Sequence, residues 1–261
     1  MAPPSDLRDW IALLEREGEL HRVSAEADPD LEITEIADRV VKSGGPALLF
    51  ERPKGSRLPL LINQFGTERR MCLAFGVESL DDVAAKLEDV LELQPPQGLV
   101  EKVKGLKKLK SIADSRPKTV SKGACQEIVL TGDDVDLDLL PIQRCWPGDP
   151  APFITLPAVI TQDPRTGSRN VGMYRMQKID SRSTFMHWQV HKDGRMDYLA
   201  TDGRLEVAVA SSTTPFCFVG EEGTLALSRG KAILSVCGDN LQFVDGRASG
   251  TAVTVSIRLR S

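Results

Sequence analysis

The chain has 261 residues, a formal net charge of −4 and a sequence pI of about 5.5. Hydrophobic residues make up 41% and charged residues 27%, the balance of a globular protein that can bury a core. The acidic charge leaves no sequence-wide basic footprint, so no nucleic acid partner is expected. Because the sequence shows neither a run of eighteen apolar residues nor a secretory leader, we expect a cytoplasmic chain with no integral membrane segment.

The first hundred residues alternate helix and strand signals. Apolar residues at helical spacing and short apolar runs predict helices over 6–17, 31–43 and 79–91, with strands over 47–51 and 59–63. Gly18 and the run 44–46 would end the first two helices, and Asp81 and Asp82 suit the start of the third. We predict a small α/β domain over 1–93.

The segment 94–118 is rich in lysine. QPPQG breaks the chain, and apolar residues then recur at helical spacing between the lysines. A basic amphipathic helix can bind a membrane surface or an acidic partner. Because the apolar residues suffice to pack one face, we favour a solvated connecting helix.

Strand signals dominate from about residue 119. Short runs punctuated by Gly and Pro predict strands over 127–132, 153–161, 169–177 and 204–210, as in a barrel or a sandwich. The fold class predicted is α+β, with a second, β-rich domain over 119–210. Within it, the acidic run 133–141 has metal-like alternation, but it lacks the central glycine and distal glutamate of a calcium loop. We favour a solvated turn there.

The octapeptide NVGMYRMQ, residues 170–177, concentrates hydrogen-bonding side chains. In a continuous strand Asn170 and Arg175 face opposite ways, and a local bend would be needed to bring them toward one ligand. The alternative is a surface strand whose arginine sits in a salt bridge. The octapeptide alone leaves both interpretations open.

Two of the three histidines, His187 and His191, follow in HWQVH. A pair at i and i+4 on a helix would suggest zinc. These two lie between strand-like segments, and the glutamate of a HExxH motif is absent. A zinc protease is therefore not favoured.

These motifs resemble the UbiD family of prenylated-flavin-dependent decarboxylases. The resemblance rests on 170–177, 186–188 and 191–195, and it extends through 140–164 and the opening 6–23 to cover roughly 5–210. It implies that the β-rich domain is a split-barrel-like cofactor-binding domain. It also implies decarboxylation of a hydroxybenzoate-like or other α,β-unsaturated acid, in quinone (ubiquinone) biosynthesis or aromatic acid metabolism.

The resemblance further implies a cofactor and a site. Prenylated FMN, delivered by a flavin prenyltransferase, would bind with Mn²⁺, and K⁺ is a further candidate ion. Asn170 and His191 would hold the metal, while Arg175 would orient the substrate carboxylate in the catalytic role. The residues expected to line the flavin are Met173, Tyr174, Arg175, His187, Trp188, Gln189, Lys192 and Asp193. Self-association into a homo-oligomer is also implied.

The resemblance ends near residue 210. The family's third metal ligand, a glutamate, its catalytic acids and its carboxy-terminal domain have no match in the divergent tail, 211–261. Alternating apolar residues over 253–259 are nevertheless typical of a half-buried strand. A catalytically incomplete relative that only binds flavin phosphate, or is vestigial, is the alternative function. A flavin reductase would need a nicotinamide site, and no GxGxxG fingerprint is present.

Overall fold

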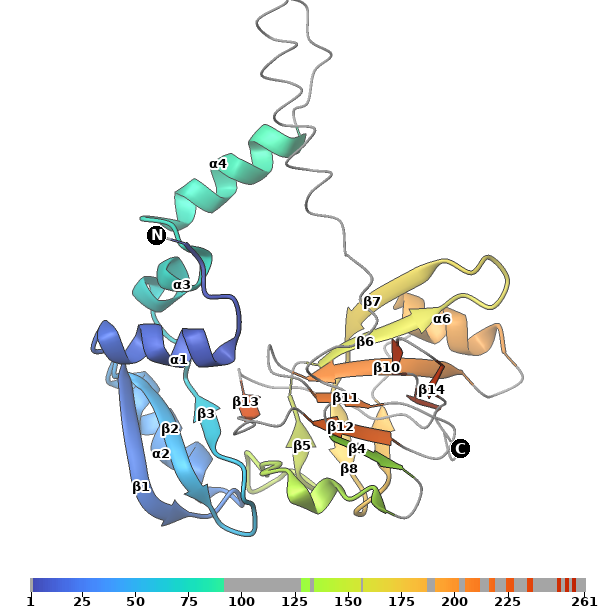
Figure 1. Cartoon of the computed structure of the whole chain (residues 1–261), viewed down its shortest axis with the longest axis horizontal. Helices are drawn as coiled ribbons and strands as arrows, with labels where there is room; N and C mark the ends of the chain where they lie inside the picture. Colours follow the sequence, from blue (N-terminus) through green and yellow to red (C-terminus); the bar gives the residue numbers. More distant parts are fainter. Residues whose placement is uncertain are drawn as a thin grey trace, which may run out of the picture.

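The computed structural model describes residues 2–91, 128–131, 134–155, 157–186, 191–201 and 205–211, together with six short strands beyond residue 211. An α/β unit built from the first ninety residues lies on one side, and a β-rich unit lies on the other (Figure 1). The described residues combine helices with several sheets, most of whose strand pairs are antiparallel, so the α+β prediction is confirmed. The predicted connecting helix and the residues 187–190 lie outside the described residues.

A four-stranded sheet forms the centre of the α/β unit. Strands β1 (Leu20–Ala27) and β2 (Ala47–Pro53) are parallel and are joined through helix α2 (Glu32–Lys42), whereas β3 (Leu60–Ile62) runs antiparallel to β2. Strand β13 (Leu234–Val236) adds to β3 in parallel. The helix predicted over 31–43 and the strands predicted over 47–51 and 59–63 are confirmed as α2, β2 and β3. Strand β13 comes from the tail and joins the same sheet.

Helix α1 (Leu7–Arg16) forms as its sequence predicts. The Asp6 carboxylate caps it by accepting hydrogen bonds from the backbone N–H groups of Arg8 and Asp9. Its apolar face is buried against Ala47, Leu49 and Leu61 of the sheet. Burying that face is what holds a helix of this length in place.

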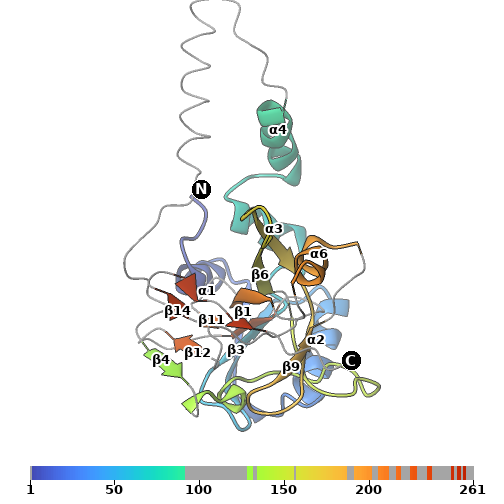
Figure 2. The same cartoon turned by 90° about the vertical axis from the view of Figure 1, so that its right-hand side faces the viewer.

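Two elements of the α/β unit were not predicted. Strand β1 is an edge strand with mostly exposed or half-buried residues, so it carries no apolar run that periodicity would detect. Helix α3 (Glu68–Phe75) is short, but Thr67 caps its first turn and Gly76 ends it at a φ of 65°. Helix α4 (Leu80–Leu91) follows, as predicted, and extends away from the body of the molecule (Figures 1 and 2).

The β-rich unit contains a larger sheet and a smaller one. The larger sheet has the order β4 (Ile128–Thr131), β12 (Thr224–Leu227), β11 (Phe216–Phe218), β10 (Glu206–Ser211), β6 (Pro157–Gln162) and β7 (Arg169–Met173), with β16 (Val255–Ser256) also pairing with β10. The smaller sheet has the order β5 (Phe153–Ile154), β8 (Met176–Lys178) and β9 (Thr184–Met186). Strands β14 (Ala248–Ser249) and β15 (Ala252–Val253) pair only with each other among the described strands.

Two predicted strands are each divided in two. The segment predicted as one strand over 153–161 forms β5 and β6, and the segment over 169–177 forms β7 and β8. The members of each pair belong to different sheets. The expectation of a continuous strand through 170–177 was therefore wrong, because the ribbon bends between the sheets.

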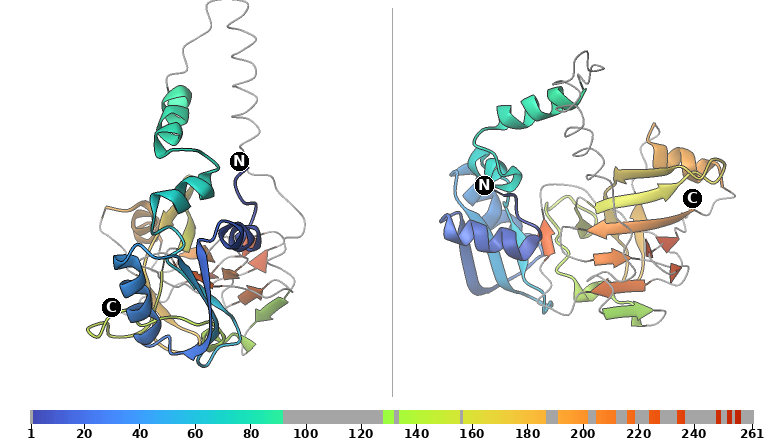
Figure 3. Two further views of the ribbon diagram at one scale, coloured as in Figure 1. Left: turned by 90° about the vertical axis from the view of Figure 1, so that its left-hand side faces the viewer. Right: turned by 45° about the horizontal axis from the view of Figure 1, so that its top comes forward.

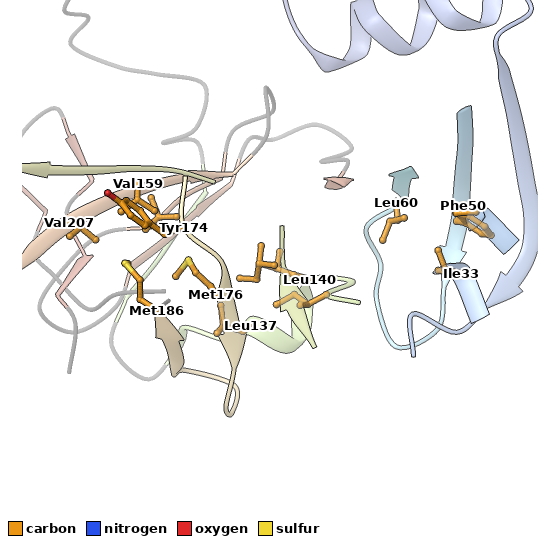
Figure 4. Packing of buried hydrophobic residues seen from close by; sticks show 14 of the residues in the cluster. Ile33, Phe50, Leu60, Leu137, Leu140, Val159, Tyr174, Met176, Met186 and Val207 are labelled. Atoms are coloured by element: carbon orange, nitrogen blue, oxygen red, sulfur yellow. The ribbon is translucent and has the colours of Figure 1, made fainter. Parts of the chain in front are cut away.

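One hydrophobic cluster joins the two units. The ribbon in Figure 3 shows the two units side by side. The cluster contains Ile33, Phe50 and Leu60 of the α/β unit together with Leu137, Leu140 and residues of both sheets (Figure 4). The acidic run 133–141 supplies this contact, since a 3-10 helix over Leu137–Leu139 buries Leu137 completely. Asp134 and Asp138 in the same run are exposed, and Asp138 pairs with Lys178. Within the described residues, no helix is long and apolar enough to cross a bilayer.

Candidate functional site

The candidate site is built on a bent two-stranded ribbon. Strand β6 pairs with β7, and the same two segments pair again as β5 with β8. Ile154 pairs with Met176, and Ala158 pairs with Met173. Between these two pairs the first segment has three residues, 155–157, and the second has only two, 174–175. An extra residue of this kind bends the ribbon and redirects neighbouring side chains. The two residues at the bend on the second strand are Tyr174 and Arg175.

Tyr174 is fixed at this bend. Its ring is buried, and its hydroxyl oxygen accepts a hydrogen bond from the backbone N–H of Gly194 at 3.1 Å. Gly194 lies in helix α6 (Asp193–Leu199), which packs against β6 and β7. The ring also lies against Gly172, where an added Cβ would come within 2.6 Å of it. Tyr174 therefore joins the end of β7 to the start of α6.

Arg175 is supported by its neighbours and keeps donors that no described residue accepts from. Its guanidinium carbon lies 4.1 Å from the centre of the Phe153 ring, a cation–π contact. The Asp149 carboxylate is 3.7 Å from Nη2, too far for a hydrogen bond, and 34% of the arginine side chain is exposed. Its buried Nε has no hydrogen-bond partner among the described residues. The surface salt bridge considered from the sequence is thus present only as a loose contact.

Asn170 belongs to a buried polar network at the other end of β7. Its Nδ2 donates to Thr161 Oγ1 at 3.3 Å, and Thr161 Oγ1 donates to Asp197 Oδ2 at 2.5 Å. Thr161 and Asn170 are direct partners across the β6–β7 pair, and Asp197 lies on α6. Three elements therefore meet at these three polar side chains.

The remaining described candidates surround the same helix and hairpin. His191, Lys192 and Asp193 are exposed at the start of α6. Met173 is 66% exposed on β7, an apolar side chain left uncovered next to Tyr174. The hydrogen bond to Gly194 places Tyr174 at the start of α6, and His191 precedes that helix by two residues. Among the described residues, no hydrogen bond links Asn170 to His191. His187, Trp188 and Gln189 lie outside the described residues.

The side chains present suit the phosphate of a flavin. Tyr174 and Gly194 are joined by a hydrogen bond, and the residue after each of them is an arginine, Arg175 or Arg195. In both arginines the buried Nε has no hydrogen-bond partner among the described residues. Guanidinium groups with unused donors are the usual partners of phosphate oxygens. An amide oxygen from Asn170 and an imidazole from His191 are donors that suit Mn²⁺. The described residues contain no cluster of three His, Cys, Asp or Glu side chains.

The turn between β6 and β7 is stabilised by charge. Both Nε and Nη2 of Arg165 donate to the Asp163 carboxylate, at 3.0 and 3.2 Å, and the Arg165 backbone N–H donates to it at 2.8 Å. These bonds lower the pKa of Asp163 from 3.8 to about 2. The turn therefore holds an ionised carboxylate over the whole neutral range.

Several residues of the site were not found from the sequence. Asp149 and Phe153 contact Arg175, Thr161 and Asp197 form the network with Asn170, and Gly194 holds Tyr174. Helix α6 itself was not predicted, because its seven residues are too few to show a helical period. The WPGDP turn that contains Asp149 was the one available signal, since such turns often carry functional side chains.

Two family models match the chain. Residues 11–89 match the 3-octaprenyl-4-hydroxybenzoate carboxy-lyase N-terminal domain, and residues 118–222 match the Rift-related domain of the same carboxy-lyase. An uncharacterized protein of Archaeoglobus fulgidus is 48% identical over 214 residues. The aligned part is 80% of this chain and 44% of the relative, so the chain spans less than half the length of that protein.

Solved structures agree with this assignment. The UbiD-class enzyme HmfF of Pelotomaculum thermopropionicum, an evolved dimeric form in complex with prFMN, has a TM-score of 0.65 and 27% identity over 80% of this chain and 44% of its own. The closed form of the vanillic acid decarboxylase of Sedimentibacter hydroxybenzoicus has a TM-score of 0.70, covering 93% of this chain and 65% of that one. At 20% identity the second shows a likeness of fold alone. Because the two family models together match most of the described residues, the chain belongs to the UbiD family.

Proposed function

We propose that this chain binds prenylated FMN with a divalent metal, and that it acts in the non-oxidative decarboxylation of a hydroxybenzoate-like or other α,β-unsaturated carboxylic acid. The observation that carries the proposal is Arg175, a cation that is held in place yet keeps donors without a partner among the described residues. The prFMN and FMN complexes of HmfF support the choice of cofactor for this family.

Arg175 suits the binding of a carboxylate. The Phe153 ring supports the guanidinium at 4.1 Å, and the 3.7 Å distance to Asp149 leaves Nη2 without a close acceptor there. A planar guanidinium can donate two parallel hydrogen bonds to one carboxylate. Holding the carboxylate in one orientation removes part of the entropic barrier to breaking its bond to carbon.

The other side chains have supporting roles in this proposal. Met173, Tyr174, His187, Trp188, Gln189, Lys192 and Asp193 would line the flavin, and Asn170 and His191 would hold Mn²⁺, with K⁺ as a further ion. When bound, the prenylated flavin supplies the electron-accepting group that decarboxylation needs. Tyr174 keeps the strand end fixed against α6, so that Arg175 faces the substrate from a rigid support. A flavin prenyltransferase would supply the cofactor, and a homo-oligomer would be the working form.

A second candidate function rests on the divergent tail, 211–261. The resemblance assigns the proton-donating acids to a region after residue 210, and no motif of that kind is matched there. Carbon dioxide loss leaves a carbon that must receive a proton from an acid of suitable pKa. A chain without that acid would bind the cofactor and release no product.

One experiment separates the two candidates. The chain is co-expressed with a flavin prenyltransferase, supplied with Mn²⁺ and assayed anaerobically on hydroxybenzoates and cinnamate-like acids, as wild type, Arg175→Ala and Arg175→Lys. We expect Arg175→Ala to lower kcat/KM by at least about tenfold, because a hydrogen bond to a charged group contributes roughly 1.5–3 kcal/mol. Arg175→Lys should also lose activity, since an ammonium cannot form the paired contact.

The control is Arg182→Ala, an exposed arginine in the turn between β8 and β9. It should keep both flavin absorbance and turnover. Equal turnover by wild type and Arg175→Ala would contradict the proposed role. Bound flavin without turnover in the wild type would identify the chain as a cofactor-binding module.

A further inference from the structure

Asn170, Thr161 and Asp197 form a hydrogen-bonded network that packing alone does not require. Asp197 on α6 is 6% exposed, and Thr161 on β6 is 1% exposed. Burying a carboxylate and a hydroxyl costs free energy unless both are hydrogen-bonded. An apolar pair would fill this space without that cost, so the arrangement calls for a reason beyond packing.

The donors and acceptors in the network permit one arrangement. As a carboxylate, Asp197 can only accept, so the single hydroxyl proton of Thr161 is donated to it at 2.5 Å. Thr161 then has only lone pairs to offer to its other neighbour. That neighbour, Asn170, must present its NH₂ group, and the 3.3 Å contact from Nδ2 matches this requirement.

The amide oxygen of Asn170 is consequently turned away from Thr161. No hydrogen bond between described residues reaches this oxygen, and Asn170 is half-buried rather than enclosed. Amide oxygens are ligands for hard divalent cations, whereas an amide NH₂ is not. The orientation of the amide therefore decides whether Asn170 can be a ligand at all.

We propose that Asp197 is a positioning residue that acts through Thr161 to present the amide oxygen of Asn170 to a divalent cation. The inference rests on the proposed function for the identity of the cation. It goes beyond that function by assigning roles to Asp197 and Thr161, two residues outside the proposed metal and flavin contacts. Asp197 and Gly194 also attach α6 at two points, to Thr161 on β6 and to Tyr174 directly after β7.

The test uses the full chain with Thr161→Val, which removes the hydroxyl and keeps the shape, and Thr161→Ser, which restores it. Thr184→Val is the matched control, because Thr184 is also buried in a strand but its hydroxyl has no partner among the described residues. Far-UV circular dichroism and thermal unfolding confirm that each variant is folded. A merely structural role for Thr161 would alter stability and leave the measurements below unchanged.

The first measurement needs no metal. In the ¹⁵N–¹H spectrum, the side-chain NH₂ of Asn170, assigned by its disappearance in Asn170→Asp, should show one proton protected from solvent exchange. Protection should persist in the wild type, Thr161→Ser and Thr184→Val, and it should be lost in Thr161→Val. Unchanged protection in Thr161→Val would overturn the inference, whatever the protein's activity.

The second measurement is the Kd for Mn²⁺, from the electron paramagnetic resonance of free Mn²⁺ titrated with the flavin-loaded chain. Loss of an outer hydrogen bond to a metal ligand weakens metal affinity about 10- to 100-fold, and we expect this for Thr161→Val. Thr161→Ser and Thr184→Val should match the wild type. Equal affinity in Thr161→Val would overturn the inference, whereas a wild type that binds no Mn²⁺ would overturn the metal site of the proposed function.

Discussion

Tyr174 shows how one side chain can hold two elements of the site together. Its ring lies over Gly172, two residues earlier on the same strand, and its hydroxyl reaches the backbone of Gly194 on α6. The ring needs the space that a side chain at position 172 would occupy. Glycine is therefore needed at position 172 because the Tyr174 ring approaches it closely, and not because of its backbone φ.

Gly172→Ala should disturb this arrangement. The new Cβ would lie 2.6 Å from the Tyr174 ring, closer than side-chain atoms normally approach, so the ring must move away from Gly194. Overpacking of this kind typically costs about 1–3 kcal/mol of unfolding free energy. We expect a loss in that range in urea denaturation, together with weaker flavin binding measured by fluorescence.

Gly148→Ala is the control for that substitution. An added Cβ there meets no atom within 4 Å, and Gly148 lies in an exposed turn. Its unfolding free energy and flavin affinity should stay close to those of the wild type. If Gly172→Ala behaved in the same way, the close packing of Tyr174 would not be what fixes the end of β7.

At the scale of elements, the β6–β7 hairpin carries both the metal candidate Asn170 and the residues of the bend. Its turn is closed by hydrogen bonds from Asp163 N–H to Ser168 C=O and from Gly167 N–H to Asp163 C=O. Gly167 takes a φ of 72°, a left-handed conformation that favours glycine. The Asp163 carboxylate adds the charged contacts with Arg165.

The contribution of Asp163 to stability should depend on pH. Its pKa is lowered on folding, from 3.8 to about 2, mainly by the side-chain hydrogen bond from Arg165. A carboxyl with a depressed pKa stabilises the folded state above its unfolded pKa, and this effect is lost as pH falls through the folded pKa. In urea unfolding, Asp163→Asn should therefore be less stable than the wild type at pH 6, and the difference should shrink as pH falls from about 4 toward 2. A difference that stayed constant or grew over that interval would contradict this account.

Sequence periodicity predicted the elements that bury a regular face and missed those that do not. Helix α1 shows its period because Leu7, Ile11 and Leu14 pack on one sheet. Strand β1 lies at a sheet edge and α6 has only seven residues, so neither carries a readable pattern. The bend at Tyr174 depends on an extra residue in the partner strand, which the octapeptide cannot reveal.

The candidate site was predictable to a similar degree. The motif resemblance selected Asn170 and Arg175 as candidates, two polar side chains only five residues apart, and their roles stay a prediction. It gave no indication of Asp197 or Phe153, because these act only through contacts made across the fold. Supporting residues of this kind become visible when the elements are placed in space.

At the scale of the whole molecule, the α/β unit and the β-rich unit share one core. The contact is polar as well as apolar: Leu31 N–H donates to the Arg144 carbonyl, and Arg144 Nε donates to the Asp30 carboxylate at 2.6 Å. Ser56 Oγ donates to the Leu139 carbonyl at 2.9 Å. Because main-chain bonds and buried side chains both cross this boundary, we expect the two units to unfold together.

Leu137 is the residue that tests this coupling. It is fully buried in the shared cluster, whereas Leu139, two residues away in the same 3-10 helix, is 41% exposed. Leu137→Ala should lower the unfolding free energy by about 2–5 kcal/mol, and Leu139→Ala should change it by about 0.5 kcal/mol or less.

Both changes can be measured by urea denaturation, followed in parallel by Trp10 fluorescence and by far-UV circular dichroism. Trp146 and Trp188 are replaced by Phe, so that Trp10 is the only tryptophan that fluoresces. Since Trp10 lies in the α/β unit, in a cluster that does not include Leu137, a shift of its transition with that of the whole chain would show that the core is shared. A Trp10 transition that stayed at the wild-type urea concentration would instead show that the two units unfold independently.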